Sequence, residues 1–480
     1  MITPGLIKTI QDIMRKDEGV DGDAQRLSQL VWLIFLKVLD DSDSQRETMD
    51  ESYTSAMPAK FQWRNWAADP AGITGDVLLD FVNNELFPGL STLPTSGNKR
   101  TDVIRAAFDG SYNYMKNGTL LRQVINKINE VNFNSSDDRH TFNDVYENLL
   151  ASLQNAGNAG EYYTPRPVTR FIVEMVNPRL GETVFDPACG TGGFLANAIE
   201  YMRPQANIPE DLKVLEKSIR GVEKKQLPYL LCTTNMMLHG IEDPVGVLHD
   251  NTLRKPLTSY GPADYVDCIT ANPPFGGKEE DGIEDNFPSW GRTRETADLF
   301  LQLFVRLLKP GGRAGIVLPD GTLFGEGVKT RIKQHLLEEC NLHTIVRLPG
   351  SVFAPYTSIA TNLLFFTKGE PTKEVWYYEH RLPEGVKAYS KTKPIRIEEF
   401  DMIKEWWQDR KETDVAWKVS IDEIIKRGYN LDIKNPNIVK IDELNPEEVL
   451  VEYRAKQAEV KNIVEQIRRE LTEALAHHDN

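Results

Sequence analysis

The sequence has few cysteines, no long apolar run and fewer basic than acidic residues. Its four cysteines, Cys189, Cys232, Cys268 and Cys340, lie far apart and form no Cys-x-x-Cys pair, which argues against a disulfide framework or a zinc site. No segment approaches the roughly 18 apolar residues that a membrane span needs, and residues 1–10 lack a signal-peptide pattern. We therefore expect a reduced, cytoplasmic protein without a membrane segment or a metal.

The composition is typical of a folded globular protein, and one tetrapeptide in the sequence is unusual. The 480 residues leave room for about three domains, and 40% hydrophobic with 26% charged residues is typical of globular proteins. The tetrapeptide, Asn272-Pro273-Pro274-Phe275, follows the apolar run 265–271, which predicts a buried strand. A strand-ending turn is one explanation of these four residues.

The chemistry of the tetrapeptide favours a second explanation, a site that holds an aromatic amine. The exocyclic amine of adenine is a weak nucleophile, because its lone pair is delocalised into the ring. The side-chain carbonyl of Asn272 and the main-chain carbonyl of Pro273 would accept its two N–H hydrogens, and Pro273 and Pro274 would keep both acceptors stiff. Phe275 would stack on a base that has been flipped out of a duplex.

A glycine-rich segment lies upstream. Residues 183–194 are predicted to form a short strand, a tight turn and the start of a helix. Glycines in such a turn let the backbone approach a nucleotide at a helix N-terminus. The spacing is not Gly-x-Gly-x-x-Gly, which argues against a nicotinamide or flavin cofactor. A plain turn is the alternative, but the later Asn-Pro-Pro-Phe favours a ligand-binding loop.

This loop resembles the strand-end loop of S-adenosylmethionine-dependent methyltransferases, which wraps the methionine part of the cofactor. The resemblance implies these cofactor-binding residues in the loop: Asp186, Ala188, Gly190, Thr191, Gly192 and Gly193. An upstream segment, which in the family packs against the methionine end, adds Glu161, Tyr162, Tyr163, Thr164, Pro165 and Arg166. Capping of the next helix is the alternative role for that segment.

Two further predicted strands end in cofactor-binding candidates. Glu223 would accept hydrogen bonds from the ribose hydroxyls, as in related α/β folds. It lies 37 residues after Asp186 (223 − 186), more than the usual ~20, and we attribute the excess to a loop around 203–209. Asp250 and Asn251 end the next strand, where Asp250 would bind the adenine amine of the cofactor. An exposed strand-end aspartate explains Asp250 nearly as well.

The order of these segments is similar to that of the γ class of DNA adenine-N6 methyltransferases. Within that class, the runs GEYYTPRPV, FDPACGTGGF, NPPF, GGRAGIVLPDGTLF and GYNLD resemble the modification subunit of type I restriction-modification systems, over nearly the whole chain. The resemblance implies a Rossmann-like α/β domain. It also implies in-line transfer of a methyl group from S-adenosylmethionine to N6 of a flipped-out adenine, without a metal or a covalent intermediate.

The acidic composition bears on how such a protein holds DNA. With 71 acidic and 56 basic residues, the chain has a formal net charge of −15, whereas DNA binding depends on Lys and Arg at the phosphates. Either a local basic groove, with Lys278, Arg292, Arg294 and Lys309 as candidates, or a partner holds the DNA. We favour the partner. The family resemblance implies a separate specificity subunit, a second modification subunit and, as a further candidate, a restriction subunit.

Three domains are expected: a helical N-terminal domain over 1–155, the methyltransferase domain over 156–435 and a helical tail over 436–480. Helical periodicity supports the first at 23–39, 74–87, 120–129 and 141–154, with a loop at 94–98. In the family this domain helps to close around DNA, and a stabilising bundle is the alternative. Its aromatic cluster is expected in the core or an interface: Phe61, Trp63 and Trp66.

The tail has an apolar stripe within 446–476 that must be buried against something. Docking on a partner's helices is favoured over packing on its own domain, because the stripe is terminal. The residues of the stripe are Val460, Ile463, Val464, Ile467, Leu471 and Leu475.

Three other functions are alternatives to this one. A protein glutamine methyltransferase uses a related Asn-Pro-Pro site, but such proteins are shorter and commonly have Tyr in place of Phe275. An RNA adenine methyltransferase would be expected to carry a basic RNA-binding segment, which the sequence lacks. A non-catalytic scaffold predicts a decayed site, whereas Asp186 and Asn272 are both present.

Overall fold

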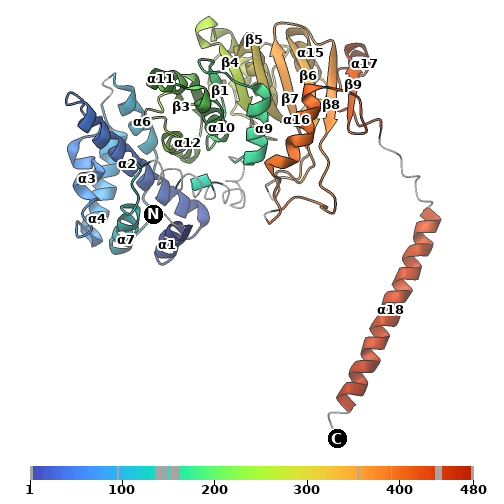
Figure 1. Cartoon of the computed structure of the whole chain (residues 1–480), viewed down its shortest axis with the longest axis horizontal. Coiled ribbons are helices and arrows are strands. Elements are labelled where there is room, and N and C mark those ends of the chain that lie inside the picture. Colours follow the sequence, from blue (N-terminus) through green and yellow to red (C-terminus); the bar gives the residue numbers. More distant parts are fainter. Residues whose placement is uncertain are drawn as a thin grey trace. The chain divides into compact units, whose positions relative to one another are not determined.

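An open sheet of nine strands organises the larger of two structural units, Met1–Lys434, and the smaller unit is Asn435–Asn480. The computed structural model describes residues 4–94, 97–135, 142, 146–147, 150, 163–354, 356–390, 392–437 and 446–476. Figure 1 shows the N-terminal helices in blue beside the sheet. Among the described residues, no helix has both the length and the apolar character that crossing a membrane demands.

The strand order is β3-β2-β1-β4-β5-β7-β6-β8-β9. The strands are β1 Val184–Asp186, β2 Ile219–Glu223, β3 Val247–His249, β4 Val266–Ala271, β5 Leu308–Pro319, β6 Cys340–Arg347, β7 Thr361–Lys368, β8 Glu374–Glu379 and β9 Ala416–Ser420. β3, β2, β1, β4 and β5 are parallel, whereas β7 is antiparallel to both β5 and β6. The parallel half confirms the predicted Rossmann-like architecture. Because strand order reverses at β1, the carboxyl ends of β1 and β4 border a crevice where such folds bind ligands.

Helices cover both faces of the sheet, which explains why its central strands are apolar without alternation. One face is covered by α9 Arg166–Val176, α10 Gly193–Met202 and α12 Gln226–Leu238. The other is covered by α13 Thr296–Leu307 and α15 Val328–Glu339. The short helices α14 Asp320–Phe324, α16 Asp401–Gln408 and α17 Ile421–Lys426 complete this region.

The spacing between the first two strands has a different origin from the predicted loop. After a short 3₁₀ turn at Arg203–Gln205, an additional helix, α11, occupies Pro209–Ser218 and leads directly into β2. Most of the inserted length is therefore helical. The acidic first turn of α11, with Asp211 accepting the main-chain N–H of Asn207 at 2.8 Å, is a helix-start signal that the sequence contained.

The secondary structure of the described N-terminal residues is helical, as expected. The helices are α1 Pro4–Met14, α2 Asp23–Met49, α3 Trp63–Trp66, α4 Gly75–Asp80, α5 Phe87–Ser91, α6 Lys99–Phe108 and α7 Gly118–Ile128. The predicted helix 74–87 consists of α4, a π-helical stretch at Phe81–Leu86 and the start of α5. Phe61, Trp63 and Trp66 are buried in the core. The predicted helix 141–154 lies mostly outside the described residues.

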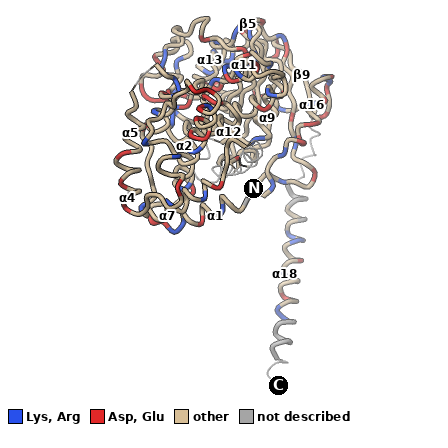
Figure 2. The backbone as a smooth tube through the Cα atoms, turned by 60° about the vertical axis from the view of Figure 1, so that its left-hand side comes forward, with Lys and Arg blue, Asp and Glu red and all other residues tan. Residues whose placement is uncertain are grey.

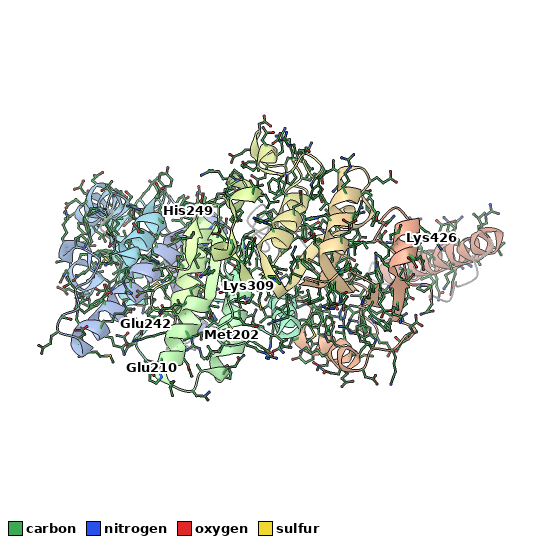
Figure 3. The ribbon with its side chains drawn as sticks, turned by 90° about the horizontal axis from the view of Figure 1, so that it is seen from above. Met202, Glu210, Glu242, His249, Lys309 and Lys426 are labelled. Atoms are coloured by element: carbon green, nitrogen blue, oxygen red, sulfur yellow. The ribbon has the colours of Figure 1, made fainter. Side chains whose placement is uncertain are left out.

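Buried charge joins the N-terminal helices to the α/β region. The Arg100 guanidinium, 6% exposed, donates to Asp43 on α2 at 2.6 Å and also pairs with Asp243, which precedes β3. Arg46 on α2 pairs with Glu242 at 2.8 Å, and Figure 3 labels Glu242 where the blue helices meet the green α/β region. Because a buried charge left without its partner is costly, these contacts fix how the two regions pack.

The described part of the smaller unit contains one helix, α18, over Pro446–Ala476. Its bounds confirm the predicted helix. The apolar residues of its described part are exposed: Leu450, Val451, Tyr453, Val460, Ile463, Val464 and Ile467.

Candidate functional site

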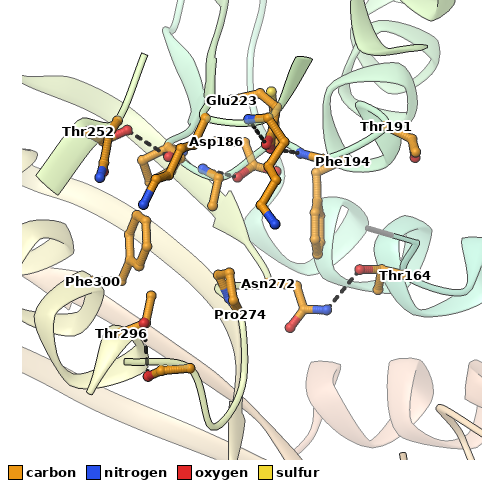
Figure 4. Close-up of a pocket in the computed structure, with 18 of the residues that line it drawn as sticks. Thr164, Asp186, Thr191, Phe194, Glu223, Thr252, Asn272, Pro274, Thr296 and Phe300 are labelled. Atoms are coloured by element: carbon orange, nitrogen blue, oxygen red, sulfur yellow. Dashed lines mark hydrogen bonds between the residues drawn. The ribbon is translucent and has the colours of Figure 1, made fainter. Parts of the chain in front are cut away.

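A cavity of about 260 Å³ opens at the carboxyl ends of β1, β2, β3 and β4. Eleven of the predicted site residues line it: Thr164, Asp186, Ala188, Gly190, Thr191, Gly193, Glu223, Asp250, Asn251, Asn272 and Pro274. Figure 4 shows Asp186 and Glu223 at one end of the cavity and Asn272 at the other. The strand order explains this meeting, because β1, β2, β3 and β4 are neighbours whose carboxyl ends lie at one edge.

The glycine-rich turn after β1 has the backbone that its sequence requires. Gly190 and Gly192 have φ angles of 54° and 80°, in the left-handed region that favours glycine. Gly193 starts α10 in close contact with Arg166, since a Cβ atom added to Gly193 would lie 2.0 Å from the Arg166 guanidinium. A side chain at Gly190 or Gly192 would therefore strain the backbone of the turn, and a side chain at Gly193 would collide with Arg166.

Two carboxylates at this end of the cavity are held by main-chain N–H groups. Asp186 accepts from Ala188 at 3.0 Å, and Glu223 accepts from Gly190 at 2.9 Å and from Lys225 at 2.7 Å. Burial raises the pKa of Asp186 to about 8, and burial also raises the pKa of Glu223. A cation that binds beside these two carboxyl groups would therefore stabilise their ionised forms and lower their pKa values.

The end of β3 adds a second polar cluster. Asn251 is buried and donates from Nδ2 to Glu279 at 3.2 Å, and Lys224 pairs with the same Glu279 oxygen at 3.1 Å. Asp250 lines the cavity and is also exposed, with Arg254 at 3.4 Å. The loop that follows the Asn-Pro-Pro-Phe segment thus reaches back, through Glu279, to the ends of β2 and β3.

At the opposite end, Asn272 directs one side of its amide towards Thr164. Its Nδ2 donates to Thr164 Oγ1 at 2.9 Å, as Figure 4 shows. Its carbonyl oxygen is buried and has no hydrogen-bond partner among the described residues. Buried polar atoms in native proteins are normally paired. An unpaired acceptor on a cavity-lining residue is a binding position for a donor group.

The other predicted residues do not line the cavity or lie outside the described residues. Tyr163, Pro165, Arg166, Gly192, Pro273 and Phe275 are not among the lining residues. Phe275 packs against Phe353 in an edge-to-face arrangement with ring centroids 6.0 Å apart, so it contacts another aromatic ring beside the cavity. Glu161 and Tyr162 lie outside the described residues.

Several lining residues were not predicted from the sequence. Thr296 and Phe300 come from α13, and the Thr296 hydroxyl donates to the Gly277 carbonyl at 3.0 Å. Lys224 and Glu279 come from loops, and Thr252 begins the short 3₁₀ helix Thr252–Arg254. Only Lys224 had a local signal, its position directly after the acidic strand end. No pattern in the acidic loop distinguishes Glu279 from its neighbours.

The four basic candidates do not form a basic groove. Lys309 pairs with Asp267 at 2.8 Å near the amino ends of β4 and β5, the edge opposite the cavity. Arg292 and Arg294 pair with Asp285 and Asp281 at 3.1 and 2.5 Å, and only Lys278 lines the cavity. Figure 2 shows Lys and Arg interspersed with Asp and Glu over the larger unit.

Comparisons with known proteins agree with this geometry. Residues 137–443 match the family model of N-6 DNA methylases, and residues 6–128 match that of the HsdM N-terminal domain. The chain is 58% identical to the type I restriction enzyme EcoEI methylase subunit of Escherichia coli, over 99% of both chains. It is 30% identical to the EcoKI methylase subunit of E. coli strain K12, over 78% of this chain and 70% of that relative.

Solved structures give the same result. A chain from a structural study of complex assembly and conformational transition of the type I R-M system has a TM-score of 0.83 and 39% identity, with 97% of each chain covered. Since these similarities extend from the N-terminal helices through the catalytic domain, the protein belongs to the family of type I restriction enzyme methylase subunits, which are adenine-specific N6 DNA methyltransferases.

Proposed function

We propose that this subunit transfers a methyl group from S-adenosylmethionine to N6 of an adenine flipped out of duplex DNA, while a separate specificity subunit reads the sequence. The observation that carries the proposal is the buried, unpaired carbonyl oxygen of Asn272 at the edge of a cavity whose other end holds two buried carboxylates. A donor group from the substrate fits the first feature, and a cationic cofactor fits the second.

The residues at the β1 and β2 ends fit the cofactor. Gly190 and Gly193 line the cavity without side chains of their own, and Glu223 keeps a lone pair on each oxygen for ribose hydroxyls. Asp186 would balance the positive charge of the methionine part. When bound, S-adenosylmethionine supplies an electrophilic methyl group on a sulfonium.

Asn272 and Pro273 act on the acceptor. Their carbonyl oxygens would accept the two N–H hydrogens of the adenine amine and draw its nitrogen towards tetrahedral geometry. As the new N–C bond forms, the bond between the methyl carbon and the sulfonium sulfur would break and leave its electron pair on a neutral sulfur. The two acceptors would stabilise the positive charge that grows on the nitrogen, which would then release one of its protons to solvent. Alignment of donor and acceptor supplies the rest of the rate enhancement.

Methyl-transfer assays test this chemistry against its alternatives. Tritiated S-adenosylmethionine is offered with duplex DNA, RNA or protein, with and without a co-expressed specificity subunit. We expect label in N6-methyladenine of duplex DNA, and only when the partner is present. Label in RNA or in glutamine side chains would refute the proposed substrate.

The partner is also implied by charge. Three of the four basic candidates are paired with aspartates, and one of the three, Lys309, lies at the edge opposite the cavity, so these candidates offer little positive charge for DNA phosphates. We infer that the specificity subunit, with a second methylase subunit, holds the duplex over the cavity. In this arrangement residues 1–155 close on the DNA, 156–435 catalyse and 436–480 dock on the partner.

A seam of positions on α18, which shares Val460, Val464 and Ile467 with the predicted apolar stripe, indicates which kind of partner the helix docks on. Positions 450, 453, 457, 460, 464 and 467 follow a spacing of alternately three and four residues, the seam of a coiled coil, and all are apolar except Gln457. One flank of this seam is basic, with Arg454, Lys461 and Arg468. A second copy of α18 would bring like charges together. A partner helix with acidic residues along its facing flank would be complementary.

Truncation tests the docking role. A chain that ends at Ile441 should bind S-adenosylmethionine with unchanged affinity in calorimetry, because the cavity residues all precede Lys434. It should not co-elute with the specificity subunit in size-exclusion chromatography. Normal assembly of the truncated chain would refute the docking role and leave the proposed chemistry intact.

A further inference from the structure

We infer that Thr164 is a positioning residue for Asn272: its hydroxyl holds one side of the Asn272 amide so that the carbonyl oxygen is presented to the adenine amine. This inference rests on the proposed catalytic role of Asn272. The family resemblance assigned Thr164 to the cofactor, but its one described side-chain hydrogen bond is the 2.9 Å contact with Asn272 Nδ2.

The torsion that turns an asparagine amide about its last bond is broad, because it joins an sp³ carbon to an sp² carbon. Packing alone therefore defines the amide plane weakly. In this site the carbonyl oxygen of Asn272 has no partner among the described residues, so the amide is held from its nitrogen side. Thr164 is the group that holds it.

The direction of this hydrogen bond decides which end of the amide meets the substrate. An adenine amine that has to be activated presents N–H donors, so only the carbonyl end of Asn272 is productive. With Nδ2 donating to Thr164, the carbonyl end is the one left for the substrate. If the amide rotated by half a turn, its NH₂ group would face the incoming amine and repel it.

Thr164 is suited to this task because its own backbone is fixed. It stands between buried Tyr163 and Pro165, the residue before α9. The next residue, Arg166, pairs with Glu147 through two guanidinium nitrogens and lies against Gly193 at the start of α10. The segment that holds Asn272 is therefore anchored directly on the cofactor loop. This arrangement fixes the acceptor amide relative to the methyl donor.

Substitution of Thr164 in the complete complex with its specificity subunit tests the inference. Valine keeps the shape of threonine but cannot accept a hydrogen bond, so Thr164→Val should lower kcat by about tenfold, the rate equivalent of one neutral hydrogen bond. The calorimetric affinity for S-adenosylmethionine and its KM should stay at wild-type values. Thr164→Ser, which keeps the hydroxyl, should restore kcat.

Three outcomes would overturn the inference. The first is wild-type kcat in both Thr164→Val and Thr164→Ala, and the second is a serine variant as slow as the valine variant. The third is a loss of cofactor affinity whose rate defect disappears at saturating S-adenosylmethionine, which would make Thr164 a cofactor ligand. The alanine variant covers the case in which valine prevents folding. Full activity of Asn272→Ala would instead refute the proposed function itself.

Discussion

The two ends of the cavity differ in how their polar groups are satisfied. At the cofactor end, Asp186 and Glu223 accept hydrogen bonds from main-chain N–H groups of the loops that they support. At the acceptor end, the carbonyl of Asn272 has no partner among the described residues. The first end is thus preformed by internal bonds, and the second leaves one acceptor for the substrate. Substitutions at the two ends should therefore affect different kinetic parameters.

Replacing Asn272 or Asn251 with alanine should show the largest difference between the two ends of the cavity, because one substitution should lower kcat and the other should lower cofactor affinity. Asn272→Ala removes an acceptor that acts on the reacting amine, so kcat should fall by about 10²–10³-fold or more. Cofactor affinity in calorimetry should not change. Asn251→Ala is the matched control: it removes the contact with Glu279 at the cofactor end and should weaken cofactor binding while kcat at saturation persists. Near-wild-type methyl transfer by Asn272→Ala would defeat the mechanism.

Glu223→Gln should have the next largest effect, and this effect should be a lower affinity for S-adenosylmethionine. A glutamine has one acceptor oxygen, so either the Gly190 or the Lys225 N–H loses its partner in a buried site. We expect the dissociation constant for S-adenosylmethionine to rise by about tenfold or more, with kcat unchanged at saturation. Glu280→Gln, at an exposed carboxylate that pairs with Lys224, should leave affinity unchanged. A lower kcat with normal cofactor affinity in Glu223→Gln would contradict the proposal that the two ends of the cavity control different kinetic parameters.

Cofactor binding should depend on pH through Asp186. Burial raises the pKa of this carboxyl to about 8, so below pH 8 the free protein carries it protonated. A cationic cofactor favours the charged form, and binding should then release a proton. Affinity should rise with pH by at most about tenfold per unit up to pH 8 and then level off. Calorimetry in buffers of different ionisation enthalpy measures the released proton. Asp186→Asn should remove this dependence.

The smallest expected effect concerns stability without the cofactor. A group with a raised pKa in the folded state stabilises the protein at low pH, and this contribution is lost as pH rises through the folded-state pKa. Above pH 8 the wild type must keep a charged, buried Asp186, whereas Asp186→Asn does not. The variant should therefore melt higher than the wild type at pH 9, by on the order of 2 °C, and the gain should shrink at pH 6. An equal gain at both pH values would contradict the assigned cause.

Prediction from the sequence succeeded where the signal is local. The strand, turn and helix around Asp186 depend on residues within about ten positions, because glycine φ angles and helix starts are set by neighbours. For the same reason, the helical N-terminal region and the bounds of α18 were predicted correctly. The helix α11 was not predicted, because its start signal follows a stretch with Pro204 and Asn207 that is typical of a loop.

The four basic candidates show that the charge composition of a sequence segment does not predict a DNA-binding groove. Lys309 is near the catalytic segment in sequence, yet it lies at the opposite edge of the sheet and pairs with Asp267. Whether a cation is free to meet a phosphate depends on which carboxylates the fold places beside it. The number and order of charged residues along the chain do not show which carboxylate will lie beside which cation.

By itself, the sequence determined the chemistry that this protein carries: a glycine turn for a nucleotide-like cofactor and a rigid Asn-Pro-Pro segment for an amine. Only the tertiary structure decided how these parts are joined, as in the bond between Thr164 and Asn272, which are 108 residues apart. Turn and cap preferences act over a few residues, whereas contacts between loops follow from the order in which strands pair. The orientation of one amide group thus depends on the assembled sheet.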